Sequence, residues 1–277
     1  MLPRRFFLAA GILPPLMHAA QSDYIAAIEH WRREREAALK AEDGWLSVAG
    51  LHWLAAGGNQ IETAPGVTFT LAGGVVAMKS SKPVEVNGKA VRQAALIPDV
   101  PGPADMLTIG GKTIFVILRG PRFGLRIRDP RSPFREKFRG LDWYPVNRKY
   151  RIEGRWVPYE TPLKRSIATV VGIDEEMVAP GAVEFTLGGK ACKLEPVLSA
   201  KRLFFIFKDP TAGKTTYPAG RFLYAEPAHN GVVELDFNKA INPPCAFTPH
   251  ATCPLPPRQN HLQAPVEAGE RNYHHDY

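Results

Sequence analysis

The sequence predicts a mostly β protein in which an N-terminal helix is followed by two β-sandwich- or barrel-like subdomains and a proline-rich C-terminal strap. Two observations support this class. The 26 prolines and 24 glycines are spread along the 277 residues, a pattern that favours many short strands joined by turns. Apolar content of 45% and charged content of 22% are ordinary for a folded globular protein, and the length suits one or two domains.

Residues 1–20 have the layout of a removable export signal. Arg4 and Arg5 precede an apolar stretch, residues 6–17, that is too short to span a bilayer. The adjacent arginines resemble the twin-arginine export signal, and general secretion is the alternative. We therefore expect a periplasmic or secreted protein whose mature chain begins near Gln21 or Ser22. No other apolar run approaches membrane length, so no integral membrane segment is expected after the signal is removed.

The segment 21–44 is expected to be helical over residues 22–41. Tyr24, Ile28 and Trp31 belong to a set of apolar residues that recur at helical spacing, and Gly44 is a typical helix stop. We expect this helix to pack on a sheet.

Residues 45–128 are expected to form the first β subdomain, because the hydrophobic period shortens from Trp45 onward. Turn pairs such as Asn87-Gly88 and Gly110-Gly111 separate the predicted strands. These strands cover residues 67–71, 75–79, 84–86, 106–109, 113–118 and 123–128. This segment resembles forkhead-associated sandwiches, but their phosphothreonine-binding Arg and Ser-x-x-His signature is missing, so no such function is carried over.

A connector rich in proline, arginine and aromatic residues, 129–148, leads to a second β subdomain, 149–277. Its predicted strands cover residues 150–156, 183–187, 203–207, 220–224 and 232–237. Residues 203–207 are continuously apolar, which is typical of a central strand. The tail has seven prolines between Asn242 and Pro265, so we expect it to be an ordered strap without regular structure.

Positive charge is concentrated in one window. Residues 119–151 hold eleven Lys or Arg and three acids, although the whole chain has a formal charge of only +8. Arg126 and Arg128 are expected on the same side of a strand, where they could bind polysaccharide carboxylates or lipid phosphates. The alternative is a salt-bridge seam between the subdomains. Nucleic acid is not an expected partner of an exported protein.

Three segments in the second half combine polar and turn-forming residues: 208–222, 236–245 and 253–270. At these residues, and at Asp43-Gly44-Trp45-Leu46-Ser47 and Trp143-Tyr144-Pro145-Val146, the chain resembles domain of unknown function family 1684. The resemblance covers roughly residues 24–273, and it implies shared architecture without a known reaction. His52 and His250 stand where relatives are expected to have aromatic residues, which argues against a mechanism built on either histidine.

Asp209, Arg221, Asp236 and Asn238 are the candidate catalytic residues. Asp236 and Asn238 share a face at a strand end, and Asp209 and Arg221 bracket a turn. If their strands are neighbours, the four side chains converge and could polarise a substrate or move a proton. The alternative is structural, since Asp and Asn often cap turns and Arg often pairs with Asp. Asn242 and Glu270 join Arg126 and Arg128 as candidate ligand-binding residues.

The three cysteines are compatible with a disulfide, a metal site or free thiols. In an oxidising compartment Cys245 and Cys253 are expected to form a disulfide, while Cys192 is expected to be buried in a strand. A metal site that combines Cys245, His250 and Cys253 with Asp236 or His261 is an alternative, as are free packed thiols. We expect no metal and no cofactor.

Three functions are compatible with these observations. The first is an exported binding protein for an anionic small molecule, a saccharide or a lipid headgroup. The second is a hydrolase that uses the Asp209, Arg221, Asp236 and Asn238 cluster. The third is a structural or scaffolding envelope protein. A cleft with converging acids would favour the hydrolase, and a basic face with fully paired acids would favour the binding protein.

Overall fold

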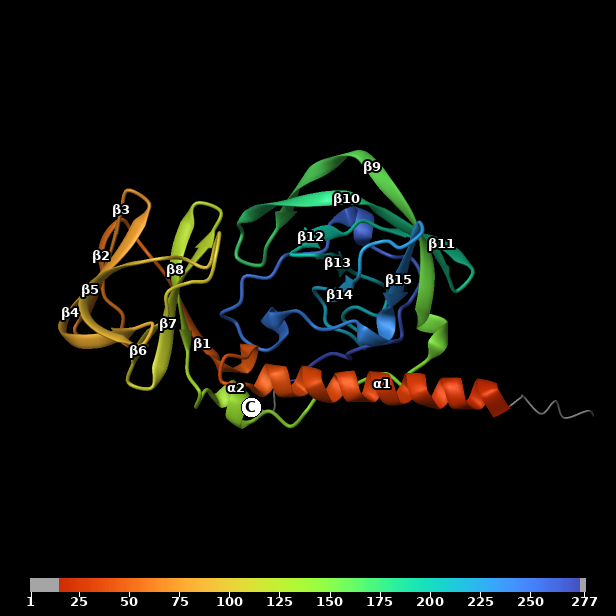
Figure 1. Cartoon of the computed structure of the whole chain (residues 1–277), viewed down its shortest axis with the longest axis horizontal. Coiled ribbons are helices and arrows are strands. Elements are labelled where there is room, and N and C mark those ends of the chain that lie inside the picture. The colour runs from red at the N-terminus through yellow and green to blue at the C-terminus, as the bar shows by residue number, and fades with distance from the viewer. Residues whose placement is uncertain (1–14, 275–277) are drawn as a thin grey trace, which may run out of the picture.

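The computed structural model describes residues 15–274, with side chains from residue 22 onward. It is mostly β, with an N-terminal helix and two β-rich halves side by side, which confirms the predicted fold class (Figure 1). The first half holds β1 to β8, and the second holds β9 to β15. No helix in the described part of the chain is long and apolar enough to cross a membrane.

Helix α1 (Pro15–Lys40) runs along one side of the second half (Figure 1). Ile28 and Leu39 are each 1% exposed, so the helix buries one apolar stripe as its spacing predicts. At Gly44, a Cβ atom would lie 2.4 Å from the carbonyl oxygen of Leu39, so no larger residue fits where the chain leaves the helix.

The helix begins at Pro15, earlier than the predicted start at residue 22. Arg4, Arg5 and residues 6–14 of the predicted signal lie outside the described residues.

One antiparallel sheet forms the first half. Its strands are β1 (Val48–Trp53), β2 (Gly57–Asn59), β3 (Val67–Ala72), β4 (Val75–Val86), β5 (Lys89–Leu96), β6 (Leu107–Ile109), β7 (Lys112–Arg119) and β8 (Arg122–Arg128). The order is β1-β8-β7-β6-β4-β3-β2, and β5 also pairs with β4. Phe69, Val116 and Leu125 lie in its core and are fully buried.

Residues 75–79 and 84–86, predicted as two strands, are parts of the single strand β4. Residues 81–83 are exposed, and the register with β5 shifts between Lys79 and Val84. The polar residues that look like a turn are therefore accommodated in an irregularity of a continuous strand. Asn87 and Gly88, with φ of 49° and 77°, form the turn from β4 to β5, a strand that was not predicted.

A short connector leads to the second half and contains α2 (Pro133–Glu136) and the 3-10 helix η2 (Arg148–Tyr150). The strands that follow are β9 (Arg151–Ala168), β10 (Asp174–Leu187), β11 (Lys190–Leu194), β12 (Val197–Ser199), β13 (Arg202–Phe207), β14 (Arg221–Ala225) and β15 (Val232–Asp236). One sheet has the order β11-β10-β9-β15, and the other has the order β12-β13-β14.

The long strands β9 and β10 arch over the small sheet as a curled half-barrel (Figure 1). Strand β13 is central, as its apolar sequence predicts, and Phe205 and Phe207 are fully buried in the core between the sheets.

Residues 240–274 contain no strand. They include two 3-10 helices, η4 (Pro244–Ala246) and η5 (Arg258–Asn260). Thr248 donates to the carbonyl of Val48 at 2.9 Å, and Thr252 contacts Arg126, so part of the segment lies against the first half. A simple strap across the second half is therefore not confirmed.

Candidate functional site

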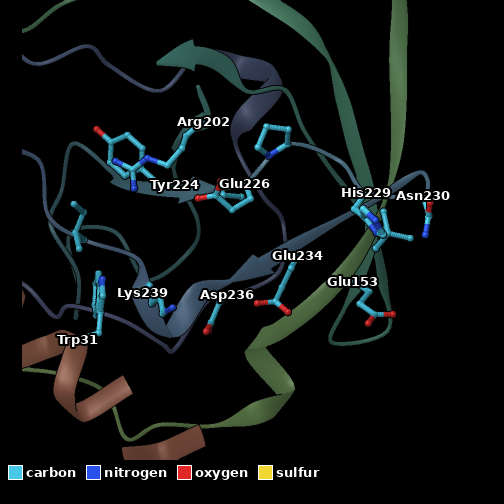
Figure 2. A pocket seen from close by; sticks show the side chains of 14 residues that line it. Trp31, Glu153, Arg202, Tyr224, Glu226, His229, Asn230, Glu234, Asp236 and Lys239 are labelled. Atoms are coloured by element: carbon cyan, nitrogen blue, oxygen red, sulfur yellow. The ribbon is translucent and has the colours of Figure 1, made fainter. Parts of the chain in front are cut away.

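Two hollows meet on the second half of the protein. One, the acidic groove, has a volume of about 650 Å³ and lies between β14 and β15 (Figure 2). The other, the inter-half cleft, has a volume of about 780 Å³ and is lined by residues of both halves. Arg202, Tyr224 and Ile241 line both, so the two hollows are continuous at these side chains.

Carboxylates and aromatic rings line the acidic groove. Tyr224 and Glu226 lie on the β14 side, Glu234 and Asp236 come from β15, and Trp31 comes from α1 (Figure 2). The lining also includes Glu153, Lys239 and Arg202. Four carboxylates against two cationic side chains give the lining a net charge of −2 with His229 neutral.

Asp236 has one carboxylate oxygen fixed by the scaffold and one free. Its Oδ1 accepts from the hydroxyl of Tyr24 at 2.9 Å and from the backbone N–H and Nδ2 of Asn238, both at 3.1 Å. Burial, followed by the charge of Asp236, raises the pKa of Tyr24. Oδ2 accepts no hydrogen bond from any described residue, and Asp236 lines the groove while only 7% exposed. The carboxylate is thus oriented, with an acceptor left for a ligand.

Asn238 binds the connector to this network. Its Nδ2 donates to the carbonyl of Asn147 at 3.0 Å, and its Oδ1 accepts from the backbone N–H of Asn147 at 2.9 Å. Asn238 is completely buried, so it positions Asp236 and does not face the groove.

Strands β14 and β15 each have unpaired main-chain groups beside the groove, at Tyr224 and at Glu234. The backbone N–H of Trp156 in β9 donates to the carbonyl of Gly231 at 2.8 Å. Because hydrogen-bonded pairs alternate along antiparallel strands, Glu234 directs its backbone N–H and C=O away from β9. In β14, the backbone N–H and C=O of Phe222 both bond to Ile241, so they are directed away from β13. Tyr224 is two residues further along, so its backbone N–H and C=O are directed to the same side. Within residues 15–274, neither Glu234 nor Tyr224 has a main-chain partner on that side.

Arg202 supplies a cationic group at the junction of the two hollows. Its guanidinium lies 4.6 Å from the ring centroid of Tyr224, which itself stacks on Phe204 with centroids 4.7 Å apart. Among the described residues no carboxylate lies within 4 Å of Arg202. Stacking fixes the plane of the guanidinium and leaves its N–H groups available for a ligand.

The inter-half cleft is more apolar. Trp45, Phe204 and Phe222 contribute aromatic surface, and Arg35 and Arg119 contribute charge. Both of these arginines are already paired: Arg119 binds Asp99 at 2.8 Å, and Arg35 binds Glu270 at 2.9 Å.

The structure does not bring the four candidate catalytic residues together. Asp209 and Arg221 form a buried ion pair with Nη2 and Oδ2 2.9 Å apart, and neither side chain lines either hollow. Arg221 also donates to the carbonyls of Val266 and Ala268, so this pair holds the C-terminal segment. Only Asp236 of the four faces a hollow.

Asn242 and Glu270 lie together behind the inter-half cleft. Glu270 is fully buried, and burial raises the pKa of its carboxyl group against the opposing effect of Arg35. Its Oε1 accepts from Nε of Arg35, and its Oε2 accepts from the backbone N–H of Asn242 at 2.7 Å. Asn242 lines the cleft at 1% exposure.

Arg126 and Arg128 share one side of β8, while Leu125 and Ile127 lie in the core on the other, as the alternation predicts. Arg126 is only 4% exposed and donates to Oγ1 of Thr252 at 3.3 Å. It therefore lies in the seam between the halves, and its burial, with the nearby charge of Arg119, lowers its pKa to about 10. Binding of a ligand at these arginines stays a prediction.

The predicted disulfide is not formed. All three cysteines are free, and Cys192, on β11, is half-buried. Sγ of Cys253 accepts from the backbone N–H of Cys245 at 3.1 Å, which directs this sulfur toward the main chain. Among the described residues, no group of three or more His, Cys, Asp or Glu side chains is placed to hold a metal ion, so the arrangement with His250 and His261 is not present.

Sequence reasoning missed Arg202, Tyr224, Glu226 and Glu234. Glu234 could have been found, because it is two residues before Asp236 on a strand and so shares its face. Arg202 and Tyr224 come from neighbouring strands of the small sheet, and their spacing in the sequence carries no such signal.

The fold and the groove define a class of mostly β proteins with a polar groove beside unpaired main-chain groups of two strands. Residues 136–271, which include both sides of the groove, match the family model described as a protein of unknown function (DUF1684). The chain belongs to this family over that segment, which confirms the resemblance seen in the sequence.

Solved structures similar to the chain include an uncharacterized protein of Haloarcula marismortui determined by solution NMR. It is 31% identical, the match covers 50% of this chain and 78% of that one, and the TM-score is 0.42. No curated protein matches the chain.

Proposed function

We propose that this is an exported binding protein for a saccharide that carries a single carboxylate, and that the ligand lies in the acidic groove. The observation that carries the proposal is the pairing of two unsatisfied groups across one hollow. Arg202 offers a stacked guanidinium without a carboxylate partner, and Asp236 offers an oriented carboxylate oxygen without a donor.

The remaining groups fit the body of a sugar. Sugar hydroxyls donate to carboxylates, and the ring of Trp31 can cover the apolar face of a pyranose. The free main-chain groups of Glu234 and Tyr224 supply further donors and acceptors. A volume of about 650 Å³ is in the ordinary range for a small-molecule site.

The charge of the groove limits the ligand. With a net charge of −2, the lining repels a dense polyanion, whereas one carboxylate can bind Arg202 in a bidentate pair. This supports a uronic acid-containing oligosaccharide over a lipid phosphate.

Calorimetric titration of the purified protein with a trisaccharide that holds one galacturonate and two galactose residues, and with the corresponding neutral trigalactoside, tests this. Wild-type protein should bind the acidic sugar more tightly. Arg202→Ala should weaken binding of the acidic sugar about 10- to 100-fold, because a charge-assisted hydrogen bond is worth about 1.5–3 kcal/mol. The same change should bring its affinity close to that for the neutral sugar.

Arg122→Ala is the matched control. Arg122 also stacks on an aromatic ring, 4.2 Å from the centroid of Trp53, but it lines neither hollow. Equal binding of the acidic sugar by the Arg202 variant and wild type, or no binding of either sugar by wild type, would contradict the proposal.

A further inference from the structure

Three sulfur-containing residues belong to one apolar cluster beside the inter-half cleft. Cys253 is 4% exposed, and Cys245 and Met177 pack against the same buried core, which includes Phe222 and Ala251. The two cysteines are in direct contact, because the backbone N–H of Cys245 reaches Sγ of Cys253 at 3.1 Å. Cys253 and Met177 also line the cleft, so these two residues border a space that opens to solvent.

A buried cation lies next to these thiols without a direct ion-pair partner among the described residues. Arg126 is 4% exposed, and no carboxylate lies within 4 Å of it among the described residues. Its Nε is buried and has no hydrogen-bond partner. One Nη atom reaches Oγ1 of Thr252, the residue before Cys253, and the guanidinium stacks 5.2 Å from the ring of Trp45, in the same apolar cluster as the cysteines.

This arrangement indicates that a negative charge is missing beside Arg126. A guanidinium withdrawn from water is unfavourable unless it is paired, and a hydrogen bond to a neutral threonine and a stacked ring compensate only in part. The charge of Asp99 also acts on Arg126, but Asp99 is paired with Arg119, so the neighbouring thiol of Cys253 is the group that could supply a further negative charge. A disulfide between Cys245 and Cys253 would be neutral and would leave the arginine uncompensated.

We propose that Cys245 and Cys253 bind one Cu(I) ion as a pair of thiolates, with Met177 as a neighbouring thioether ligand and Arg126 as the counter-charge. Two S–H bonds break, two S–Cu bonds form, and two protons leave to solvent, while copper stays in the +1 state. The resulting bis-thiolate centre carries a charge of −1, which neutralises Arg126.

Sulfur ligands in an apolar shell select a soft monovalent ion. Thiolate and thioether ligands favour Cu(I), which is stable with two or three of them. A structural zinc site needs four ligands, and the described residues place no third His, Cys, Asp or Glu with the two cysteines.

Anaerobic titration of the reduced full-length mature protein with Cu(I), in competition with a chromogenic Cu(I) chelator, tests the proposal. Wild-type protein should retain one Cu(I) and release two protons. Cys245→Ser and Cys253→Ser should each weaken binding at least 100-fold, and Met177→Leu should weaken it about 10-fold. Cys192→Ser is the control, because Cys192 lies outside the cluster, and it should bind as wild type does.

A second measurement does not depend on variants. Cu(I)-loaded wild-type protein, alkylated under native conditions and analysed by peptide mass, should be protected at Cys245 and Cys253 and modified at Cys192. Failure of the reduced wild type to retain Cu(I) against the chelator would overturn the proposal. So would loss of binding in Cys192→Ser equal to that in Cys245→Ser, or alkylation of Cys245 and Cys253 unchanged by Cu(I).

Discussion

Arg221 and Asp209 form an ion pair that is almost completely closed to solvent. The distance from Nη2 to Oδ2 is 2.9 Å, and the two side chains are 1% and 2% exposed. Oδ1 of Asp209 accepts from the backbone N–H of Val266 at 3.1 Å and from the hydroxyl of Thr211 at 2.7 Å. Burial, against the attraction of Asp209, lowers the pKa of Arg221. Every contact of the pair is internal, which indicates a role in stability.

Asp209→Asn should therefore lower the free energy of unfolding without affecting ligand binding. Removal of one partner from a buried pair leaves the other charge uncompensated, at a cost of about 3–5 kcal/mol. Urea unfolding followed by circular dichroism measures the change. Glu176→Gln removes the exposed pair with Lys164 and should change the free energy of unfolding far less, because solvent screens an exposed pair. Similar effects of the two substitutions would show that the Asp209 pair is not structural.

Asp236→Asn should weaken ligand binding and leave the stability of the fold nearly unchanged. An asparagine can keep the Oδ1 acceptor for Tyr24 and Asn238, so the melting temperature should stay near that of wild type. It replaces the free carboxylate oxygen in the groove by an N–H donor, so affinity for the acidic trisaccharide should fall about tenfold. A thermal melt beside a calorimetric titration separates the outcomes. A large loss of stability with unchanged binding would place Asp236 in the scaffold.

The strands that the sequence predicts well are those with a strong local pattern. Residues 203–207 are apolar throughout and form the central strand β13, and Asn87-Gly88 forms the turn that its chemistry requires. Strands β9 and β10 are longer than predicted. Their outer parts pair with each other through the backbone but carry many exposed polar residues, so the sequence there lacks the hydrophobic alternation that predicts a strand.

The site was predictable only in part, because it depends on which strands are neighbours. Asp209 follows β13 and Arg221 begins β14, in the small sheet, whereas Asp236 ends β15, in the other sheet. The strands therefore do not meet the condition under which the four side chains would converge at one edge, although each residue is at a strand end as expected. The position of Arg126 in the seam depends on Thr252, a contact across 126 residues of chain that no local pattern reports.

Export is a further prediction, and it concerns residues outside the described part of the chain. Replacement of Arg4 and Arg5 by lysine should keep the protein in the cytoplasm if the twin-arginine route is used. Fractionation of expressing cells, with the amino-terminal residue of the exported form determined by mass spectrometry, should place the mature start near Gln21 or Ser22. Normal export of the double variant would point to general secretion.

Glu195 should make stability depend on acid pH. Its carboxylate accepts from Arg165 through Nε at 2.8 Å and Nη2 at 2.7 Å, from the hydroxyl of Tyr159 at 2.5 Å and from Gln259 at 3.0 Å. Burial alone would raise the pKa of Glu195, but these hydrogen bonds outweigh it and lower the pKa to about 2, from the usual 4.5.

A depressed pKa in the folded state means that the unfolded chain binds the proton more tightly. The stabilisation from Glu195 is therefore complete above pH 4.5 and is lost as pH falls toward 2. We expect it to be about 2 kcal/mol, reduced from the full linkage value because Arg165 is 35% exposed.

Chemical denaturation of wild type and Glu195→Gln between pH 2 and pH 7 measures this stabilisation. The difference in unfolding free energy should be largest at neutral pH and should shrink as the solution is acidified, whereas Glu184→Gln, at an exposed pair with Arg155, should follow wild type. Parallel curves for Glu195→Gln and wild type over this range would show that the carboxylate is not stabilised by its partners.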